Sequence, residues 1–478
     1  MMNTKALRQK ILDLAIHGKL VPQDPNDEPA SVLLERIKAE KERLIKEGKI
    51  KRTKRSKAAC DKPHYPFELP EGWCFCCIND IAESLLGKTL DKSKDKGVPK
   101  EYLCAINVQW GRFDFSILKS FLIGENELQR YSVKQGDLMV CEGGDVGRCA
   151  IWEENEREMY YQNALHRIRC EYGVSNYFLQ YALWYYKLNG TIDYLCKGVT
   201  IKHFTQTTMS KLAIPLPPSN EQKRIVDEIQ RLFSIIDKVE ERKDNLQLTI
   251  RQTKSKILDL AIHGKLVPQD PNDEPATELL KRINPKAEIT CDNPQYENLP
   301  NGWCECTLGS LFLFIRNGIN IRQDKSKIGY PITRIETISS EFIDRSRMGY
   351  AAITEENYSD YYLQKDDILM SHINSPIHVG KCALCDIKAG EKIIHGMNLL
   401  CLRPYPDIEA KFILMVFRSA YFKNEIRPFI KNAVNQASIN IRNLSSVHLY
   451  LPPVSEQHRI VAKIEELFTQ LDKIEVSL

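Results

Sequence analysis

Residues 11–30 read "ILDLAIHGKLVPQDPNDEPA", and residues 257–276 repeat the same letters without a single change. Two further pairs of segments occur in the same order around this duplication. "LPEGWC" from Leu69 recurs as "LPNGWC" from Leu299, and "LPPSNEQKRIVDEIQRLFSIIDKVE" from Leu216 recurs as "LPPVSEQHRIVAKIEELFTQLDKIE" from Leu451. The chain therefore consists of two equivalent halves that share a frame, and the stretches of ~150 residues inside the frame resemble each other only weakly.

The segment between the two copies of the frame has the pattern of a long helix. From Asn220 to about His263 there is no Pro or Gly, and apolar residues fall at alternating spacings of four and three if Lys243 and Thr253 are allowed in the stripe, which is the signature of a coiled-coil seam. A helix of ~43 residues would be about 65 Å long. The predicted seam consists of Ile225, Ile229, Leu232, Ile236, Val239, Leu246, Ile250, Ile257 and Leu260.

The two ends of the chain together spell one more copy of this helix. The C-terminal segment repeats its first part and the N-terminal segment repeats its second part. Because an exposed apolar stripe of this length needs a partner, we expect both end segments to pack antiparallel against the central helix. The matching seam residues are Ile460, Ile464, Leu467, Leu471 and Ile474 at the C-terminus, with Leu7, Ile11 and Leu14 at the N-terminus.

The expected fold class is mixed α/β (α+β): two globular domains joined by long antiparallel coiled-coil helices in a pseudo-two-fold circular arrangement. Each globular domain has short strands broken by Gly and at least one helix, such as "NYFLQYALWYY" from Asn176. The predicted organisation is an N-terminal helix with a basic linker over 1–63, a first domain over 64–218, a helical spacer over 219–291, a second domain over 292–453 and a C-terminal helix over 454–478.

Composition limits the classes of protein that fit. No run of about 18 apolar residues could span a bilayer, and the N-terminus lacks a signal-peptide pattern, so we expect a cytoplasmic protein without membrane contact. Fifteen cysteines are scattered rather than set at framework spacings, which favours reduced thiols. Cys382 and Cys385 form a C-x-x-C, but no second pair follows at zinc-site spacing, so no metal is predicted.

Net charge is only +4, yet "KEGKIKRTKRSK" from Lys46 to Lys57 is dense in basic residues. This stretch suits either a solvated linker or an arm that contacts phosphates. "AESLLGKT" from Ala82 to Thr89 resembles a phosphate-binding loop, but its first Gly is replaced and the loop is not glycine-rich. We therefore interpret Lys88 as a surface lysine near DNA, and predict no catalytic residue in either domain, because neither contains a recognisable catalytic motif.

Two domains that are equivalent in position but different in sequence, held on a rigid frame, suit the recognition of two short sequences at a fixed separation on a DNA duplex. The side chains that read base edges must differ when the bases differ, whereas the frame that sets the spacing need not. The sequence therefore predicts a DNA-binding protein whose specificity lies in the divergent domains.

Five stretches occur along the chain in this order: "LPEGW", "GDLMVCEGGDVG", "QNALHRIR", "KGVTIKHFTQTTMSKLAIPLPPSNEQKRIVDEI" and "KSKILDLAIHGKLVPQDPNDEPA". In these stretches and their order, the chain resembles the specificity subunit of type I restriction-modification systems. The resemblance covers essentially the whole chain. Its most specific parts are the two "LPP" junctions and the two "AIHGKLVPQDPNDEPA" stretches. The second domain departs most, with "NQASINIRN" where the first has "GVTIKHFTQ".

The resemblance implies a non-catalytic subunit that binds double-stranded DNA and reads an asymmetric bipartite site with two target-recognition domains. It also implies docking of two modification (methyltransferase) subunits and of restriction (translocase and nuclease) subunits. No cofactor is expected on this chain; S-adenosylmethionine, ATP and Mg²⁺ would bind to the partners. In agreement, the chain has no Asp/Asn-Pro-Pro-Tyr/Phe, because its Pro-Pro pairs are "LPPS" and "LPPV".

The same surface is predicted twice at the helix starts, which suits two copies of one partner. The alternative is ordinary helix-start chemistry, in which acids and amides favour the helix dipole. The predicted docking residues are Glu221, Gln222, Arg224 and Ile225, and again Glu456, Gln457, Arg459 and Ile460.

Base-reading residues are expected on Gly-flanked loops, because amides suit adenine and Arg or Lys suits guanine. In the first domain they are Lys88, Arg148, Thr200, Lys202 and His203, and in the second Arg316, Asn317, Lys381, Gln436 and Asn440. Each residue also suits a phosphate contact or an ordinary surface position.

Two other classes of protein compete with this interpretation. One is a fused restriction-modification enzyme with its own catalytic domain, and the other is a coiled-coil adaptor whose variable domains bind protein. Methyl transfer by the isolated chain would favour the first, and loss of DNA binding the second.

Overall fold

The computed structural model describes residues 3–48, 67–91, 96–196, 203–287, 289–290, 299–323, 328–353, 358–433 and 436–477. The chain divides into two compact units, Met2–Arg242 and Lys243–Leu478, which we call the first half and the second half. The basic stretch after Gly48 and the predicted domain boundaries near 63 and 291 lie outside the described residues. The long central helix α8 (Ser219–Ile262) contributes its residues up to 242 to the first half and the remainder to the second.

In the first half, helix α1 (Thr4–Ile16) packs antiparallel against α8, as the apolar stripes predicted. Arg8 joins the two helices: its Nη2 donates to Asp237 Oδ1 at 2.6 Å and to Glu240 Oε2 at 2.9 Å. The same guanidinium lies over the ring of Phe233, 5.0 Å from its centroid. Asn3 caps α1 by accepting a hydrogen bond from the Ala6 backbone N–H.

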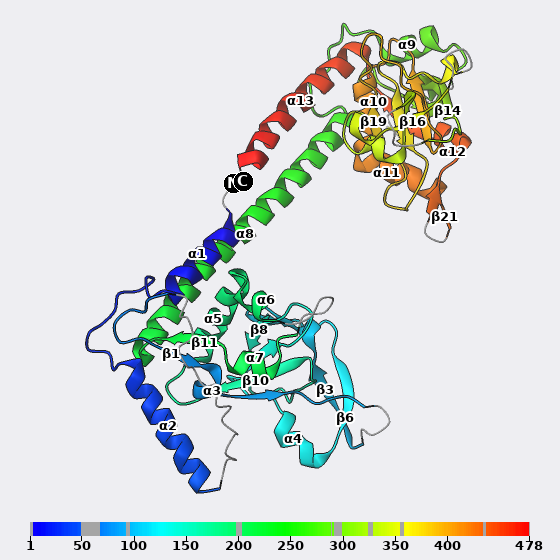
Figure 1. The fold of residues 1–478 in the computed structure, drawn as a ribbon. Helices are drawn as coiled ribbons and strands as arrows, with labels where there is room; N and C mark the ends of the chain where they lie inside the picture. The colour runs from blue at the N-terminus through cyan, green and yellow to red at the C-terminus, as the bar shows by residue number, and fades with distance from the viewer. Residues whose placement is uncertain are drawn as a thin grey trace. The chain divides into compact units, whose positions relative to one another are not determined.

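In the second half, the C-terminal helix α13 (Val454–Ser477) lies beside the rest of α8 in the same manner (Figure 1). Lys254 is at the position equivalent to Arg8, and its ammonium group pairs with Asp472 and lies 3.5 Å from Glu475. It also lies over the ring of Phe468, at 5.7 Å. The two halves therefore repeat one antiparallel helix pair with the same charges in the same places.

The predicted seam is buried at both ends of α8 but not at its middle. Ile225, Ile229 and Ile236 are buried in the first half, and Ile250 and Ile257 in the second. Val239 and Leu246 are 39% and 38% exposed. The expectation that packing buries both stripes was therefore wrong for these two residues. It was also wrong for Leu7 on α1 and Ile474 on α13, which are 39% and 45% exposed.

The globular part of the first half is built on a four-stranded antiparallel sheet in the order β2-β10-β7-β8. Smaller sheets pair β1 with β11, β4 with β5, and β3 with β6 and β9. The strands are β1 (Cys74–Cys77), β2 (Ala82–Leu86), β3 (Val98–Leu103), β4 (Val108–Gln109), β5 (Arg112–Phe113), β6 (Lys119–Ile123), β7 (Leu138–Cys141), β8 (Cys149–Ile151), β9 (Tyr160–Tyr161), β10 (Leu165–Cys170) and β11 (Ala213–Leu216).

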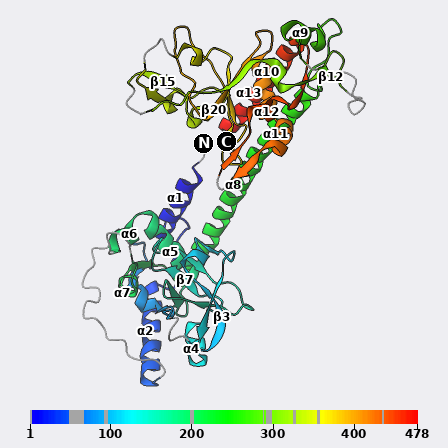
Figure 2. The same cartoon turned by 90° about the vertical axis from the view of Figure 1, so that its right-hand side faces the viewer.

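The second half repeats the four-stranded sheet in the equivalent order β14-β20-β17-β19. Its smaller sheets are β12-β13-β23, β15-β16 and β18-β22-β21, and Figure 2 shows β15 and β12 at opposite sides of this half. The strands are β12 (Ile289–Thr290), β13 (Cys304–Thr307), β14 (Phe312–Asn317), β15 (Tyr330–Ile332), β16 (Gly349–Ala351), β17 (Ile368–Ser371), β18 (Ile373–Asn374), β19 (Cys382–Leu384), β20 (Leu399–Pro404), β21 (Lys431–Ala433), β22 (Gln436–Ser438) and β23 (His448–Leu451).

One helix packs against each four-stranded sheet and joins it to the frame. These helices are α5 (Asn176–Leu188) and α10 (Ala410–Arg418), and their buried faces belong to the same apolar core as the starts of α8 and α13. The sheets and helices confirm the predicted mixed α/β class. The other α-helices are α2 (Ala30–Lys46), α3 (Ile78–Ile81), α4 (Glu125–Tyr131), α6 (Thr191–Leu195), α7 (Gln206–Ser210), α9 (Ala276–Ile283), α11 (Ala420–Ile426) and α12 (Ile441–Ser445).

Most of the cysteines in the described ranges are buried. Cys382 and Cys385 are both buried, and burial raises the pKa of Cys382 to about 11. Over the same ranges no group of three or more metal-ligating side chains comes together, and no helix is long and apolar enough to cross a bilayer.

Candidate nucleic-acid interface

Four loops meet at one end of the four-stranded sheet in the first half, and backbone hydrogen bonds join them. Gly87 N–H donates to Leu165 O at 3.0 Å, and Asn163 N–H donates to Lys88 O at 3.0 Å. Phe204 N–H donates to Glu142 O at 2.7 Å. We call residues 87–91, 142–147, 162–164 and 203–204 the first recognition face.

The second half repeats these bonds one for one. Gly318 N–H donates to Leu399 O at 3.4 Å, Met397 N–H donates to Ile319 O at 2.8 Å, and Ile439 N–H donates to His372 O at 3.0 Å. We call residues 317–319, 372–381, 396–398 and 436–440 the second recognition face. The backbone of the site is therefore duplicated although the sequence hardly shows it.

A glycine holds the loops together in each face. A Cβ at Gly87 would lie 2.2 Å from Gln162 O, and a Cβ at Gly318 would lie 2.1 Å from Gly396 O. No side chain fits where two backbones approach this closely. Both halves therefore require glycine where β2 or β14 leaves the sheet.

Side chains at equivalent positions of the two faces differ in chemistry. Ile319 takes the place of Lys88, His372 takes the place of Glu142, and Ser438 takes the place of His203. Burial raises the pKa of Glu142, and burial lowers the pKa of His372. A duplicated backbone with different polar groups is what two different half-sites require.

An ion pair with a buried carboxylate supports each sheet at the end opposite to these loops. Asp137 is buried and accepts hydrogen bonds from Arg169 Nε and Nη2, both at 2.7 Å. Asp367 is equally buried and accepts the same two bonds from Arg403, again at 2.7 Å. The two-point geometry fixes neighbouring strands of the sheet relative to one another.

Among the residues predicted to read bases in the first half, His203 is exposed beside Gly143 on the recognition face. Arg148 is half-buried and donates to Ala105 O at 2.8 Å. Lys88 is only 8% exposed, and its ammonium group donates to Glu127 at 2.9 Å. The prediction of a surface lysine at this position was wrong because the side chain folds back onto α4. Thr200 and Lys202 lie outside the described residues.

The "AESLLGKT" segment does not form a phosphate-binding loop, because its residues 82–86 are strand β2, paired to β10. This finding agrees with the interpretation that the segment is not a nucleotide site.

In the second half, Asn317, Lys381, Gln436 and Asn440 are exposed on the second recognition face. Asn440 also caps α12 by accepting a hydrogen bond from Asn443 N–H at 2.8 Å. The Arg316 side chain is engaged in contacts within the second half. It donates a hydrogen bond to Asp360 O, and its guanidinium lies 4.2 Å from the ring centroid of Phe314. A base-reading role for these residues remains a prediction.

His395 was missed by sequence analysis, although it lies beneath the second face. Its Nε2 is 2.9 Å from Leu399 O, and burial lowers its pKa to about 4. Ile377 was also missed, because an isolated apolar residue in a loop gives no sequence signal. Its side chain is 85% exposed.

The residues predicted to dock a partner are mostly inside the protein. Glu221 and Glu456 are 1% and 0% exposed, and Gln222, Gln457, Ile225 and Ile460 are likewise buried. The expectation that they form an exposed face was therefore wrong. Their docking role remains without a test, and the structure gives them internal partners instead.

Glu221 and Glu456 each close a loop of the frame onto a helix start. Glu221 accepts hydrogen bonds from Trp73 Nε1 at 2.9 Å and from Gln23 Nε2 at 3.3 Å. Glu456 accepts the same bonds from Trp303 Nε1 at 2.9 Å and from Gln269 Nε2 at 3.1 Å. Burial raises the pKa of both carboxyl groups.

Arg224 and Arg459 bind the same loops from the helix side. Arg224 Nη2 lies 2.6 Å from Asp27 Oδ2, and Arg459 Nη2 lies 2.6 Å from Asp273 Oδ2. We call each set of Glu, Trp, Gln, Arg and Asp a frame clamp. The two clamps explain why "GWC" and "PQDPNDEP" recur with the helix starts.

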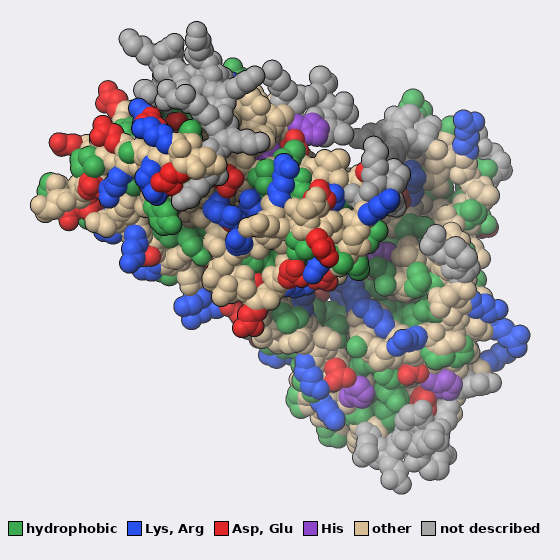
Figure 3. All heavy atoms as spheres, turned by 90° about the horizontal axis from the view of Figure 1, so that it is seen from below, with side chains coloured by type: hydrophobic (Ala, Val, Ile, Leu, Met, Phe, Trp, Pro, Cys, Tyr) green, Lys and Arg blue, Asp and Glu red, His purple; other side chains and the backbone are tan. Residues whose placement is uncertain are grey.

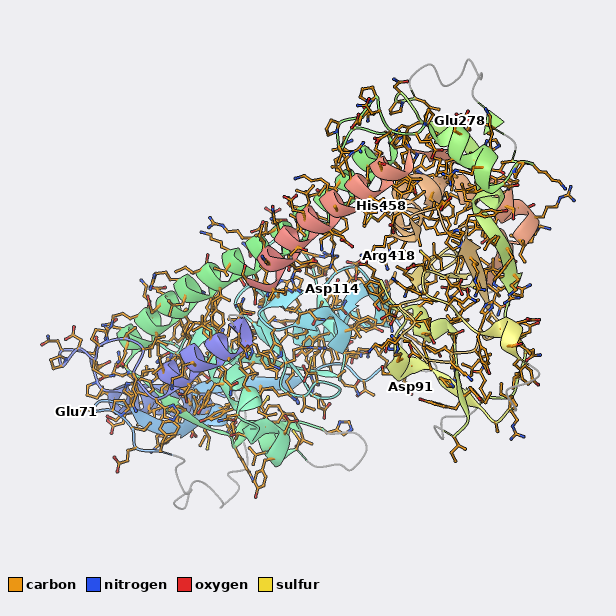
Figure 4. All side chains as sticks on the ribbon, turned by 90° about the horizontal axis from the view of Figure 1, so that it is seen from above. Glu71, Asp91, Asp114, Glu278, Arg418 and His458 are labelled. Carbon is orange, nitrogen blue, oxygen red and sulfur yellow. The ribbon has the colours of Figure 1, made fainter. Side chains whose placement is uncertain are left out.

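The face of the molecule drawn in Figure 3 carries both signs of charge. Figure 3 shows Lys and Arg side chains intermingled with Asp and Glu side chains rather than gathered in one field. Within the second half, His458 on α13 pairs with Glu409 at 2.9 Å, and Arg418 at the end of α10 pairs with Glu341 at 3.5 Å (Figure 4). Net charge alone would therefore not have located the interface.

A duplicated frame that carries two faces with equivalent backbones but different side chains defines a two-site recognition protein. Comparisons with known proteins agree. A family model described as "Type I restriction modification DNA specificity domain" matches residues 70–248 and 300–476. The chain is 29% identical to the Type I restriction enzyme EcoAI specificity subunit of Escherichia coli, over 98% of this chain and 90% of that protein.

The Type I restriction enzyme EcoEI specificity subunit of Escherichia coli is 27% identical, over 99% of this chain and 90% of its own length. A solved chain from a study of complex assembly and conformational transition of the type I R-M system shares the fold. Its TM-score is 0.59 at 20% identity, and the match covers 86% of this chain and 94% of that one.

The chain thus belongs to the family of type I restriction-modification DNA specificity subunits, as the sequence resemblance indicated. Its two domains recognise the two parts of a bipartite DNA target, and catalytic activities belong to partner subunits. DNA and the other subunits of a type I restriction-modification system are its partners. The fused-enzyme and protein-adaptor interpretations are not supported.

Proposed function

We propose that the two recognition faces read two different half-sites of one asymmetric target, while the frame docks two copies of a methyltransferase subunit. The observation that carries the proposal is the contrast between the halves. The two frame clamps match residue for residue and nearly distance for distance, whereas the recognition faces share a backbone but not their side chains.

The frame loops, rather than the buried helix starts, are the docking surface in this proposal. Residues 22–26 and 268–272 are exposed in both copies, as are Lys19 and Lys265. Gln23 and Gln269 belong to the frame clamps, but the other positions are identical in the two halves although neither burial nor a clamp contact constrains them. Two identical exposed loops present one surface twice, which suits two copies of the same partner.

The cofactors belong to the partners in this proposal. S-adenosylmethionine would bind to the methyltransferase subunits, with ATP and Mg²⁺ on restriction subunits that join the complex. The target would then receive N6-methyladenine in each half-site, and this chain would supply position and sequence choice.

Stoichiometry tests the docking surface. We expect the wild-type chain to assemble with two methyltransferase subunits in native mass spectrometry. The variants Lys19→Glu and Lys265→Glu reverse one charge on each loop, so each should lose one subunit and the double variant both. Full assembly of the double variant would contradict docking at these loops, and Lys46→Glu serves as an exposed control outside them.

A domain exchange tests the reading of half-sites. Replacing residues 64–218 with the same region of a relative should change one half of the methylated motif and leave the other unchanged. A change in both halves, or in neither, would contradict independent reading by the two faces.

A further inference from the structure

The loop that follows β7 in the first recognition face is closed by three backbone hydrogen bonds. Cys141 N–H donates to Arg148 O at 2.8 Å, Gly147 N–H to Cys141 O at 3.0 Å, and Arg148 N–H to Asp145 O at 3.2 Å. Gly147 has a φ of 82°, and Val146 beside it is buried. These contacts fix both ends of the loop.

The loop that follows β17 in the second face is closed by the same three bonds. Ser371 N–H donates to Lys381 O at 2.8 Å, Gly380 N–H to Ser371 O at 2.8 Å, and Lys381 N–H to His378 O at 3.2 Å. Gly380 has a φ of 83° and Val379 is buried. Because the closures match, His378 corresponds to Asp145.

The stretch between the matched ends differs in length. Residues 142–144 precede Asp145 in the first loop, whereas residues 372–377 precede His378 in the second. The second face therefore carries an insertion. Ile377 is the last residue before His378, where the first loop has Gly144, and a Cβ at Gly144 would meet nothing within 4 Å.

The insertion is an ordered turn that leaves Ile377 in solvent. Asn374 Nδ2 donates to Ser371 Oγ at 3.1 Å, and Ser375 N–H donates to Asn374 Oδ1 at 2.8 Å. His378 N–H donates to Ser375 O at 2.8 Å. The Ile377 side chain is nevertheless 85% exposed, so it contributes little to the core of its own half.

Strand pairing places this turn within the second recognition face. β18 pairs antiparallel with β22, with Ile373 opposite Ser438 and Asn374 opposite Ala437. Gln436, at the start of β22, is exposed on the same face. The exposed Ile377 side chain thus lies beside polar residues on the face that is proposed to read DNA.

We propose that Ile377 contacts a base directly and recognises the C5 methyl group of a thymine in the half-site read by the second face. The thymine methyl is the one apolar group on the major-groove edges of the four bases, and apolar side chains distinguish it there. The Ile377 side chain carries no charge and no hydrogen-bonding group, so the side chain itself cannot bind a phosphate. This proposal rests on DNA reading by the second face.

The test uses the complex of this chain with its methyltransferase subunit and a duplex that contains the target, identified from methylated host DNA. Each thymine of the second half-site is replaced in turn by deoxyuridine, which lacks only the methyl group. We expect one replacement to weaken binding by the wild-type complex about fourfold, the value for one buried methyl-sized group. In the Ile377→Ala complex, binding should be weaker from the start, and the same replacement should have no further effect.

The salt dependence of binding should be the same for Ile377→Ala and wild type, because no phosphate contact is lost. Val476→Ala, which changes another exposed apolar residue of the second half, should bind as wild type does. A deoxyuridine effect that persists in Ile377→Ala, or no effect at any thymine, would overturn the proposal. Weaker binding of Ile377→Ala without coupling to a methyl group would also overturn it and would indicate a wedge between base steps. Unchanged binding of the wild-type complex to a duplex whose second half-site is scrambled would instead refute DNA reading by the second face.

Discussion

The two frame clamps predict the same loss of stability when Glu221 or Glu456 is removed, so each half serves as a replicate of the other. Glu221→Ala removes the acceptor of the buried Trp73 indole N–H and one acceptor of the Gln23 amide. Gln23 keeps its hydrogen bond to Gly18 O at 2.6 Å, so its loss is small. A hydrogen bond to a charged group contributes about 1.5–3 kcal/mol, and a buried donor without a partner costs about 1–3 kcal/mol.

We therefore expect Glu221→Ala to lower the free energy of unfolding of the first half by about 2–3 kcal/mol. Glu456→Ala should lower that of the second half by the same amount, because Trp303 donates to Glu456 at the same 2.9 Å. Hydrogen exchange along a denaturant series measures the two halves separately. Each variant should change exchange in its own half.

The isosteric variants Glu221→Gln and Glu456→Gln are the controls, because they keep an acceptor oxygen for the indole. They should cost less than about 1 kcal/mol. Equal costs for the Gln and Ala variants would refute the hydrogen-bond argument, as would an Ala cost below about 0.5 kcal/mol at either site.

Three further predictions follow from the same geometry. Burial raises the pKa of Glu221 and Glu456 above the ordinary value of 4.5. The stability that these groups contribute is therefore fully present below pH 4.5 and is lost as the pH rises through the raised pKa. Glu221→Gln should flatten this pH dependence when unfolding of the first half is measured by denaturation. Arg403→Met leaves the buried Asp367 carboxylate without this arginine, whereas Arg169→Met leaves Asp137 with Arg167 Nε at 4.0 Å. Arg403→Met should therefore cost more than about 2 kcal/mol and more than Arg169→Met, and equal denaturation midpoints would contradict this order. Gly87→Ala and Gly318→Ala place a methyl group against backbone at 2.2 Å and 2.1 Å, so each should abolish discrimination in one half-site only, measured by binding to duplexes mismatched in either half.

The frame could be predicted from the sequence because its signals are local and repeated. The apolar stripe of α8 and the duplicated "HGKLVPQDPNDEP" stretch together specify an antiparallel helix pair in each half. The exposure of Val239 and Leu246 could not be predicted, because periodicity marks a face but not where its covering helix ends.

The recognition faces could be predicted only in outline. The sequence indicates a surface lysine at Lys88, whereas in the structure its ammonium group donates a hydrogen bond to Glu127, 39 positions away. The sequence likewise indicates an exposed acid at the helix start for Glu221, whereas in the structure it accepts a hydrogen bond from Trp73, 148 positions away. Such pairings depend on tertiary contacts that propensity and spacing do not encode, and the same holds for the backbone bonds that reveal Ile377 as part of an insertion.

Methylation of host DNA tests the central claim most directly. The chain is co-expressed with its methyltransferase subunit, and N6-methyladenine is mapped across the genome by single-molecule sequencing. The account predicts one asymmetric motif with two specified halves and a fixed unspecified gap, and a change in the first half alone when residues 64–218 are exchanged. A symmetric motif, a single continuous motif, or no motif from an assembled complex would contradict it.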